Sequence, residues 1–393
     1  MMDRYDFYRE CKEKVLEKAR DREIFREEAL RKLILRVVRE ESRAEEIGPD
    51  LRLQAWAGRR IFNSLCRMDV LEPLIKDENI TDIMVNGHKY IFYVKDGCML
   101  EYRDRFDSAQ RLEDLIQQIV GSVNRSVNEA SPIVDARLEA DGSRVNVVLP
   151  PAAKNGPILS LRKFRKDPIT MEELVRGGTA TEEMAEYLKQ AVRDRANIFV
   201  CGGTSSGKTT LLNILSSYID PRERVITIED SAELQLRGLK NLVTLETRNA
   251  NASGAGAITM RDLIKTSLRM NPDRIIVGEI RGAEALDMLS GLNTGHSGMS
   301  TGHANSCRDM LRRIETMVWM GAQIPLEAIR QQIASALDLM VFVEKGRDGK
   351  RRILEIVRVG EAEGGAVRLW PVVERKEGKV IWNPEERITG STG

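Results

Sequence analysis

The stretch GGTSSGKT, from Gly202 to Thr209, constrains the fold more than any other part of this chain. It fits the pattern G-x-x-x-x-G-K-[ST], in which glycines let successive backbone N–H groups curve around an anion. An apolar run, NIFV, leads into it and a helix-forming run, KTTLLNIL, follows it. This context predicts a phosphate-binding loop between a strand and a helix, with the positive end of the helix directed at the phosphates.

We expect this loop to bind ATP together with Mg²⁺. Lys208 would bring a positive charge to the β- and γ-phosphates, and Thr209 would offer its hydroxyl to the metal. The residues expected to contact the nucleotide are Gly202, Gly203, Thr204, Ser205, Ser206, Gly207, Lys208, Thr209 and Thr210.

Acidic residues follow two other apolar runs. Glu279 ends RIIVGE, and Glu229 and Asp230 end VITIED, with Glu233 just beyond. In open α/β sheets ligands bind at the carboxyl ends of strands, so Glu229 and Glu279 are expected to hold Mg²⁺ and to orient the attacking water. The sequence leaves their two roles interchangeable. Asp273 precedes its strand and therefore falls at the wrong end.

The hydrophobic pattern changes along the chain. Between residues 181 and 360, apolar strands alternate with amphipathic helices, which predicts an α/β fold with a parallel-rich sheet. The predicted parts are a helical segment over 1–68, a smaller α+β domain over 69–165, a linker or hinge over 166–180, a P-loop NTPase domain over 181–360 and a tail over 361–393.

Composition narrows the class of protein. The 61 Lys and Arg residues against 60 Asp and Glu give a net charge of +1, so no global attraction to nucleic acid or anionic lipid is expected. The five cysteines are scattered without a C-x-x-C pair, which favours reduced thiols. The charged start MMDRYDFYRE is unlike a signal peptide, and no apolar run approaches the roughly 18 residues needed to cross a bilayer. We therefore expect a cytoplasmic protein.

Four stretches in this order resemble the ATPases of the type II and type IV secretion and pilus superfamily, most closely the CpaF branch of Tad/Flp pilus assembly. They are GGTSSGKTTLLN, RVITIEDSAELQL, LRMNPDRIIVGEIRGAEALDML and NTGHSGMSTGHANSCRDMLRRIETM. The resemblance implies a RecA-like C-terminal domain, ATP hydrolysis and a hexameric ring. It also implies inner-membrane platform proteins as partners, which would hold the protein peripherally at the cytoplasmic face of the membrane, with no nucleic-acid partner.

The same resemblance assigns roles to arginines of the N-terminal domain. Arg144 in DGSRVN and Arg162 in SLRKF match family positions that reach the γ-phosphate. A guanidinium suits this role because it stays charged and makes bidentate contacts with phosphate oxygens. Arg137 and Arg281 are weaker candidates, and a salt-bridged strand arginine is the competing interpretation.

Two of the three histidines, His296 and His303, lie in GHSGMSTGH. The resemblance places this stretch in a loop that reaches the nucleotide, with His303 contacting the phosphates and His296 supporting the loop. Two other interpretations stay open: a metal site that includes Cys307, and a glycine-rich connector with incidental histidines.

Two other functions fit a P-loop core. One is a RecA-like ATPase that acts on nucleic acid, but the balanced charge and an aromatic content of 5% argue against it because few side chains could stack on bases. The other is a small-molecule kinase, for which no acceptor-binding lid is evident. An ATP-hydrolysing motor is therefore the preferred hypothesis.

Overall fold

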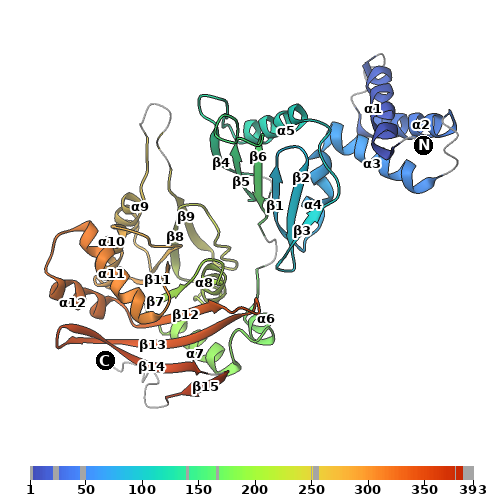
Figure 1. Cartoon of the computed structure of the whole chain (residues 1–393). Helices are drawn as coiled ribbons and strands as arrows, with labels where there is room; N and C mark the ends of the chain where they lie inside the picture. Colours follow the sequence, from blue (N-terminus) through green and yellow to red (C-terminus); the bar gives the residue numbers. More distant parts are fainter. Residues whose placement is uncertain are drawn as a thin grey trace. The chain divides into compact units, whose positions relative to one another are not determined.

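The computed structural model has two compact units, Met1–Lys166 and Asp167–Gly393 (Figure 1). The described residues are 3–20, 26–44, 50–138, 141–164, 168–248, 250, 256–376 and 378–383. The start of the predicted linker and the last ten residues of the predicted tail lie outside these ranges, and the predicted domain limits stay a prediction.

The first unit begins with three helices, α1 (Arg4–Arg20), α2 (Glu27–Ala44) and α3 (Leu51–Cys66). Helix α2 has an apolar stripe, since Leu33, Ile34, Val37 and Val38 are buried against apolar side chains of α1 and α3. Asp50 caps α3 by accepting hydrogen bonds from two backbone N–H groups. The bundle therefore forms because each helix has one apolar face and the partners to cover it.

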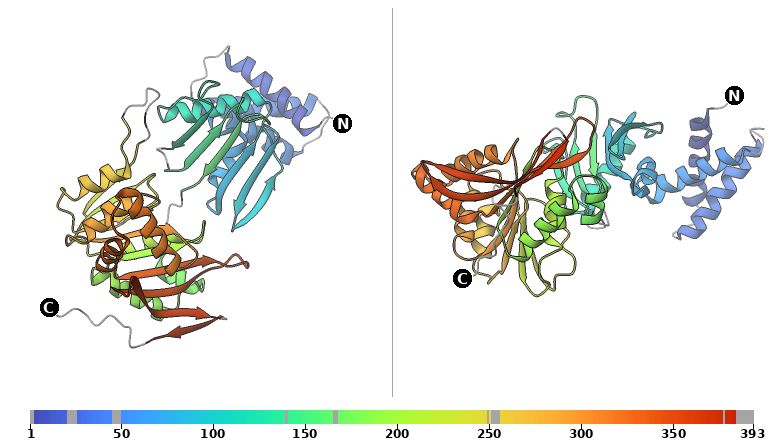
Figure 2. Two further views of the ribbon diagram at one scale, coloured as in Figure 1. Left: turned by 60° about the vertical axis from the view of Figure 1, so that its left-hand side comes forward. Right: turned by 90° about the horizontal axis from the view of Figure 1, so that it is seen from below.

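An antiparallel sheet follows, in the order β3-β2-β1-β6-β5-β4. The elements of this part are η1 (Asp69–Leu71), α4 (Glu72–Lys76), β1 (Ile80–Asn86), β2 (Tyr90–Lys95), β3 (Cys98–Tyr102), α5 (Ala109–Ser122), β4 (Ile133–Arg137), β5 (Arg144–Val148) and β6 (Ile158–Arg162). Helix α5 lies along one face of this sheet (Figure 2). This part therefore combines helices and strands, as the predicted α+β character requires.

The alternation along β5 and β6 decides which side chains reach the other face of the sheet. Val145, Val147, Leu159 and Leu161 are buried in the core beneath α5. Side chains alternate along a strand, so the residues at odd steps from these point away from α5. Arg144 on β5 and Arg162 on β6 therefore lie on the face of the sheet that is opposite α5.

A buried ionic network joins the helical bundle to the segment before α5. The Arg60 guanidinium lies 2.8 Å from Asp104 and 3.2 Å from Asp107, and its side chain is 4% exposed. Asp107 also accepts hydrogen bonds from the Tyr8 hydroxyl at 3.0 Å and the Lys12 ammonium at 2.8 Å. Each buried charge therefore has several partners, which burial of charge requires.

The second unit is built on one sheet in the order β15-β14-β13-β12-β7-β11-β10-β8-β9, parallel from β12 to β9 and antiparallel from β12 to β15. Its elements are α6 (Met171–Arg176), α7 (Glu182–Arg193), β7 (Ile198–Gly202), α8 (Lys208–Ser216), β8 (Arg224–Glu229), β9 (Asn241–Glu246), α9 (Met260–Ser267), β10 (Arg274–Val277), α10 (Glu284–Leu292), β11 (Ser297–His303), α11 (Cys307–Gly321), α12 (Leu326–Ala336), β12 (Leu339–Lys345), β13 (Arg351–Glu363), β14 (Ala366–Lys376) and β15 (Lys379–Trp382).

Helices cover both faces of this sheet, as predicted (Figure 1). Along β7, Phe199 and Cys201 pack with α9 to α12, whereas Ile198 and Val200 pack with α6 to α8. Every residue of β7 is therefore buried, which explains why NIFV is a continuous apolar run rather than an alternating one. The α/β fold with a parallel-rich sheet is confirmed.

We predict that Arg60→Ala loosens the helical bundle. Two carboxylates, Asp104 and Asp107, would lose their buried partner, at a cost of about 3 kcal/mol. Hydrogen exchange measured by mass spectrometry should therefore quicken roughly a hundredfold in α1 to α3 and stay unchanged in α10. Lys32→Ala removes the exposed Lys32–Glu28 pair and should leave exchange unchanged. Equal protection in Arg60→Ala and the native protein would contradict the role given to this network.

Candidate nucleotide-binding site

Four parallel strands bring the candidate residues to one edge of the second sheet. In the order β7-β11-β10-β8, the carboxyl ends carry Gly202, His303, Val277 and Glu229. His303 pairs directly with Gly202 across β11 and β7. Glu279 follows β10 by two residues. Because parallel strands end on the same side, residues about 75 to 100 positions apart in sequence meet here.

The phosphate loop has the backbone that its glycines predict. Gly207 has a φ of 100° and forms the N-cap of α8, and Ser205 has a φ of 58°. A side chain at Gly202 would place its Cβ 2.1 Å from the Val343 carbonyl oxygen of β12, so only glycine fits this close approach. The sheet therefore leaves no room for a side chain where the loop begins.

Lys208 is buried beneath the loop. Its ammonium donates to the Gly203 carbonyl at 2.9 Å and lies 3.3 Å from His303 Nδ1. Burial lowers the pKa of Lys208, with the Glu279 carboxylate acting in the opposite direction. A desolvated cation at the mouth of a strand–loop–helix turn is stabilised by an anion, so the site fits a phosphate group.

His303 connects Lys208 with Glu279. Since an ammonium only donates, His303 Nδ1 accepts from Lys208, and the proton of the neutral imidazole is then on Nε2, which lies 3.1 Å from Glu279 Oε1. Burial, with the Lys208 ammonium next in effect, lowers the pKa of His303. The ring is therefore neutral at pH 7 and its tautomer is fixed from both sides.

Glu279 is charged and held in place. Arg281 donates to it at 3.0 Å. Burial would raise the pKa of Glu279, but Arg281, with help from His303 and Lys208, outweighs burial and keeps the pKa below its usual value. Arg281, a weaker candidate from sequence, thus contacts the site through this carboxylate and lies 3.9 Å from Asp230.

Glu229 differs from Glu279 in its surroundings. Its carboxylate accepts from the backbone N–H groups of Glu233 at 2.8 Å and Leu234 at 3.0 Å, and its side chain is buried against Gly278. One carboxylate oxygen therefore shapes the turn after β8. Asp273 accepts from the Arg224 backbone at the amino end of β8, away from this edge, as the sequence indicated.

The structure separates the two histidines that the sequence places together. Ser297–His303 is a buried strand, not the expected loop, and Gly298 and Gly302 fit within it because a Cβ at either would meet neighbours below 3.0 Å. His296 precedes the strand and contacts the Pro272 carbonyl at 3.2 Å. At about 3.3 Å per residue the Cα atoms of the two histidines lie roughly 20 Å apart, at opposite ends of the strand, which is too far for both to bind one metal ion.

Arg144 and Arg162, both in the first unit, stand directly opposite each other on β5 and β6, and Arg137 faces Arg144 on β4. Asp82 of β1 continues the row, 3.9 Å from Arg162. The facing arginines therefore gather positive charge in one row, and Asp82 offsets part of it beside Arg162.

One contact to the phosphate loop was not predicted from the sequence. Arg351, at the start of β13, donates from Nε to the Ser205 carbonyl at 3.1 Å. Only the pairing of β12 with both β7 and β13 brings it there, and no motif around residue 351 indicates the contact.

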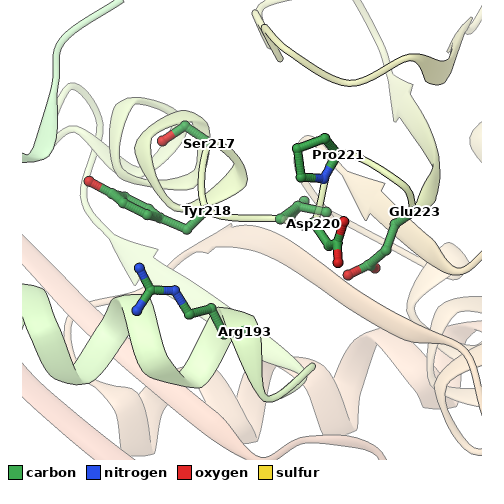
Figure 3. Close-up of a pocket in the computed structure, with 7 residues that line it drawn as sticks. Arg193, Ser217, Tyr218, Asp220, Pro221 and Glu223 are labelled. Atoms are coloured by element: carbon green, nitrogen blue, oxygen red, sulfur yellow. The ribbon is translucent and has the colours of Figure 1, made fainter.

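A hollow of about 430 Å³ lies elsewhere, lined by Arg193, Tyr218, Asp220 and Glu223 among others (Figure 3). These residues end α7 and precede β8, so they belong to the amino-terminal edge of the sheet, opposite the phosphate loop. Glu223 is already paired with the buried Arg274 at 3.1 Å.

Two features concern metals and membranes. Within the described ranges, no three or more His, Cys, Asp or Glu side chains gather closely enough to hold a metal ion by themselves. Among the helices of the described residues, none is both long and apolar enough to cross a bilayer.

Comparison with known proteins gives consistent matches. The model of the family described as "Type II/IV secretion system protein" matches residues 66–369. A putative conjugal transfer protein of Mycobacterium tuberculosis is 37% identical over 321 residues, which cover 79% of this chain and 90% of that protein. The type IV secretion system protein PtlH of Bordetella pertussis is 31% identical over 316 residues, covering 74% and 93% respectively.

Among solved structures, the pilus retraction motor PilT with bound ADP superposes with a TM-score of 0.55. It is 20% identical and the match covers 77% of this chain and 83% of that one, so it shows the fold alone. The family model excludes the three N-terminal helices almost entirely.

We predict that Lys208→Ala raises the pKa of His303, because it removes a positive charge 3.3 Å from Nδ1. Histidine NMR of the nucleotide-free protein across pH 4 to 8 would measure the change, with His303→Ala to assign the signal. Lys189→Ala, on α7 beside Tyr218, is the matched control and should leave the pKa of His303 as it is. An unchanged pKa in Lys208→Ala would show that the two side chains are not coupled.

Proposed function

The chain belongs to the type II/IV secretion system protein family and is an ATPase, and we propose that it hydrolyses Mg-ATP on the 202–210 loop as a motor for pilus assembly or protein secretion. The observation that carries this proposal is the convergence of Lys208, His303 and Glu279 at the end of the strand that leads into the loop. A nucleic-acid-dependent ATPase, the alternative from sequence, is not favoured by the comparisons.

The contacts described above support one assignment of roles to the residues of the site. The loop N–H groups and Lys208 would bind the phosphates, and the Thr209 hydroxyl would hold Mg²⁺, which would supply positive charge to the phosphate oxygens. Glu279 orients the attacking water because its carboxylate is charged and beside Lys208. Glu229, fixed by the turn after β8, helps to hold the waters around the metal.

His303 would respond to the nucleotide. In the nucleotide-free protein its imidazole accepts from Lys208, and phosphate oxygens would compete for that ammonium. Once released, the ring can donate to a phosphate oxygen. His303 therefore changes its hydrogen-bond partner when the γ-phosphate binds. His296 acts only on the fold of the strand that follows it.

Arg144 and Arg162 are proposed to complete the site by contacting the γ-phosphate. Support comes from the row of facing arginines on the sheet of the first unit and from the family resemblance of both positions. An added guanidinium can raise the rate of phosphoryl transfer by about 10³ to 10⁵.

We also propose that the protein is a CpaF-type motor of Tad/Flp pilus assembly. It would work as a hexameric ring on inner-membrane platform proteins at the cytoplasmic face of the membrane. This proposal rests on the four sequence stretches and on relatives whose names refer to conjugal transfer and type IV secretion.

We predict that Lys208→Ala and Glu279→Gln each lower the steady-state rate of phosphate release from ATP at least a hundredfold. Lys208→Ala removes the positive charge that stabilises the phosphates, and Glu279→Gln removes the carboxylate charge that orients the attacking water. Arg144→Ala and Arg162→Ala should lower it by about 10³. Release of phosphate without any acceptor also separates an ATPase from a kinase.

Lys240→Ala and Arg125→Ala, both exposed and away from the site elements, serve as charge-matched controls and should keep the native rate. Native turnover in Lys208→Ala and Glu279→Gln together would end the assignment. Native turnover in both arginine variants would remove only the role of the first unit.

We further predict that light scattering gives six times the mass of one chain, 44.4 kDa, in the presence of Mg²⁺ and a slowly hydrolysed ATP analogue. Closed rings form when one surface of a subunit binds a different surface of the next. A monomer at all protein concentrations tested, with the analogue bound, would contradict the ring.

A further inference from the structure

The phosphate loop is held by a side chain from outside the motifs of the site. Arg351 Nε donates to the Ser205 carbonyl at 3.1 Å, and the Arg351 side chain crosses the loop at Gly207. A Cβ at Gly207 would lie 3.1 Å from Arg351 Cδ. The two loop residues that Arg351 touches are those in left-handed conformation, with φ of 58° and 100°.

The position of Arg351 is fixed by the turn between β12 and β13. The Gly346 N–H donates to the Lys350 carbonyl at 2.8 Å, and Asp348 accepts from the Lys350 N–H at 3.1 Å and from Arg352. Arg351 pairs with Lys345, the last residue of β12, and β12 runs beside β7. The turn thus places the Arg351 guanidinium at the phosphate loop, while Asp348 accepts a hydrogen bond from the next arginine, Arg352.

We propose that Arg351 is a positioning residue of the nucleotide site, which holds the 202–210 loop in its phosphate-binding conformation. The inference rests on the proposed function of this loop and adds a residue to it. A non-glycine residue in left-handed conformation is strained by about 1 kcal/mol or more, and a charged donor on its carbonyl stabilises that conformation.

The chemistry also favours this orientation of the Ser205 peptide. Phosphate oxygens repel a carbonyl oxygen and attract N–H groups, so a donor that engages the Ser205 carbonyl favours the loop form whose N–H groups are available to the nucleotide. Within the described residues, no carboxylate lies within 4.0 Å of the Arg351 guanidinium, so its charge adds to the attraction of Lys208 for a polyanion.

The test compares Arg351→Ala, Arg351→Lys and Arg351→Gln with the native chain, by titration calorimetry with Mg-ADP and by steady-state ATP hydrolysis. Arg351→Ala should weaken binding of Mg-ADP and raise KM about tenfold, with kcat changed less than about threefold, because the group acts on the loop and not on the reacting atoms. Arg351→Lys keeps the charge but loses the Nε–H, so its affinity for Mg-ADP should lie between those of Arg351→Ala and the native chain.

Arg347→Ala is the matched control, since Arg347 is exposed on the same turn, and it should bind Mg-ADP as the native chain does. Hydrogen exchange of residues 203–207 in the nucleotide-free protein gives a second readout and should quicken in Arg351→Ala. If Arg351→Ala does not fold, the Gln and Lys variants carry the comparison.

Native affinity and native exchange in all three Arg351 variants, with binding abolished by Lys208→Ala, would overturn the role of Arg351 and leave the nucleotide site intact. Native affinity in Lys208→Ala as well would instead overturn the proposed function. A fall in kcat alone, with unchanged affinity, would also contradict a positioning role.

Discussion

Parallel pairing of β7, β11, β10 and β8 is the constraint on which the site depends. It brings the phosphate loop, His303, Glu279 and Glu229 to one edge, because every strand of the set ends on the same side. On its other side β7 pairs with β12, and there only glycine fits at position 202, because a Cβ would lie 2.1 Å from the Val343 carbonyl oxygen. A side chain at that position would displace β12 and, with it, the turn that carries Arg351.

The electrostatics of the site follow from burial. Lys208 and Glu279 are partly desolvated. The Gly203 carbonyl and His303 Nδ1 accept from Lys208, whereas His303 Nε2 and Arg281 donate to Glu279. The arrangement holds opposite charges close without neutralising Lys208 by direct contact with a carboxylate. Lys208 is therefore prepared for a phosphate group, and Glu279 stays ionised beside it.

The two units use arginine in opposite ways. Arg60 is buried between two aspartates and fixes the helical bundle to the rest of the first unit. Arg144 faces Arg162 and Arg137 on neighbouring strands, so like charges are gathered in one row of the sheet, with Asp82 beside Arg162. Sequence alone gives no means of separating these uses, since each arginine lies in an ordinary helix or strand pattern.

The sequence by itself determined the phosphate loop, the three strands around it, the α/β class and the acidic strand ends, because hydrophobic period and glycine placement are local properties. The tertiary structure decided what depends on strand order. It placed His303 at the site and His296 at the far edge, although seven residues separate them, because a strand between them is extended. It also distinguished Glu229 from Glu279 and brought Arg351 to a loop about 145 residues earlier in the chain. Such contacts arise from pairing between distant strands, which no local pattern encodes.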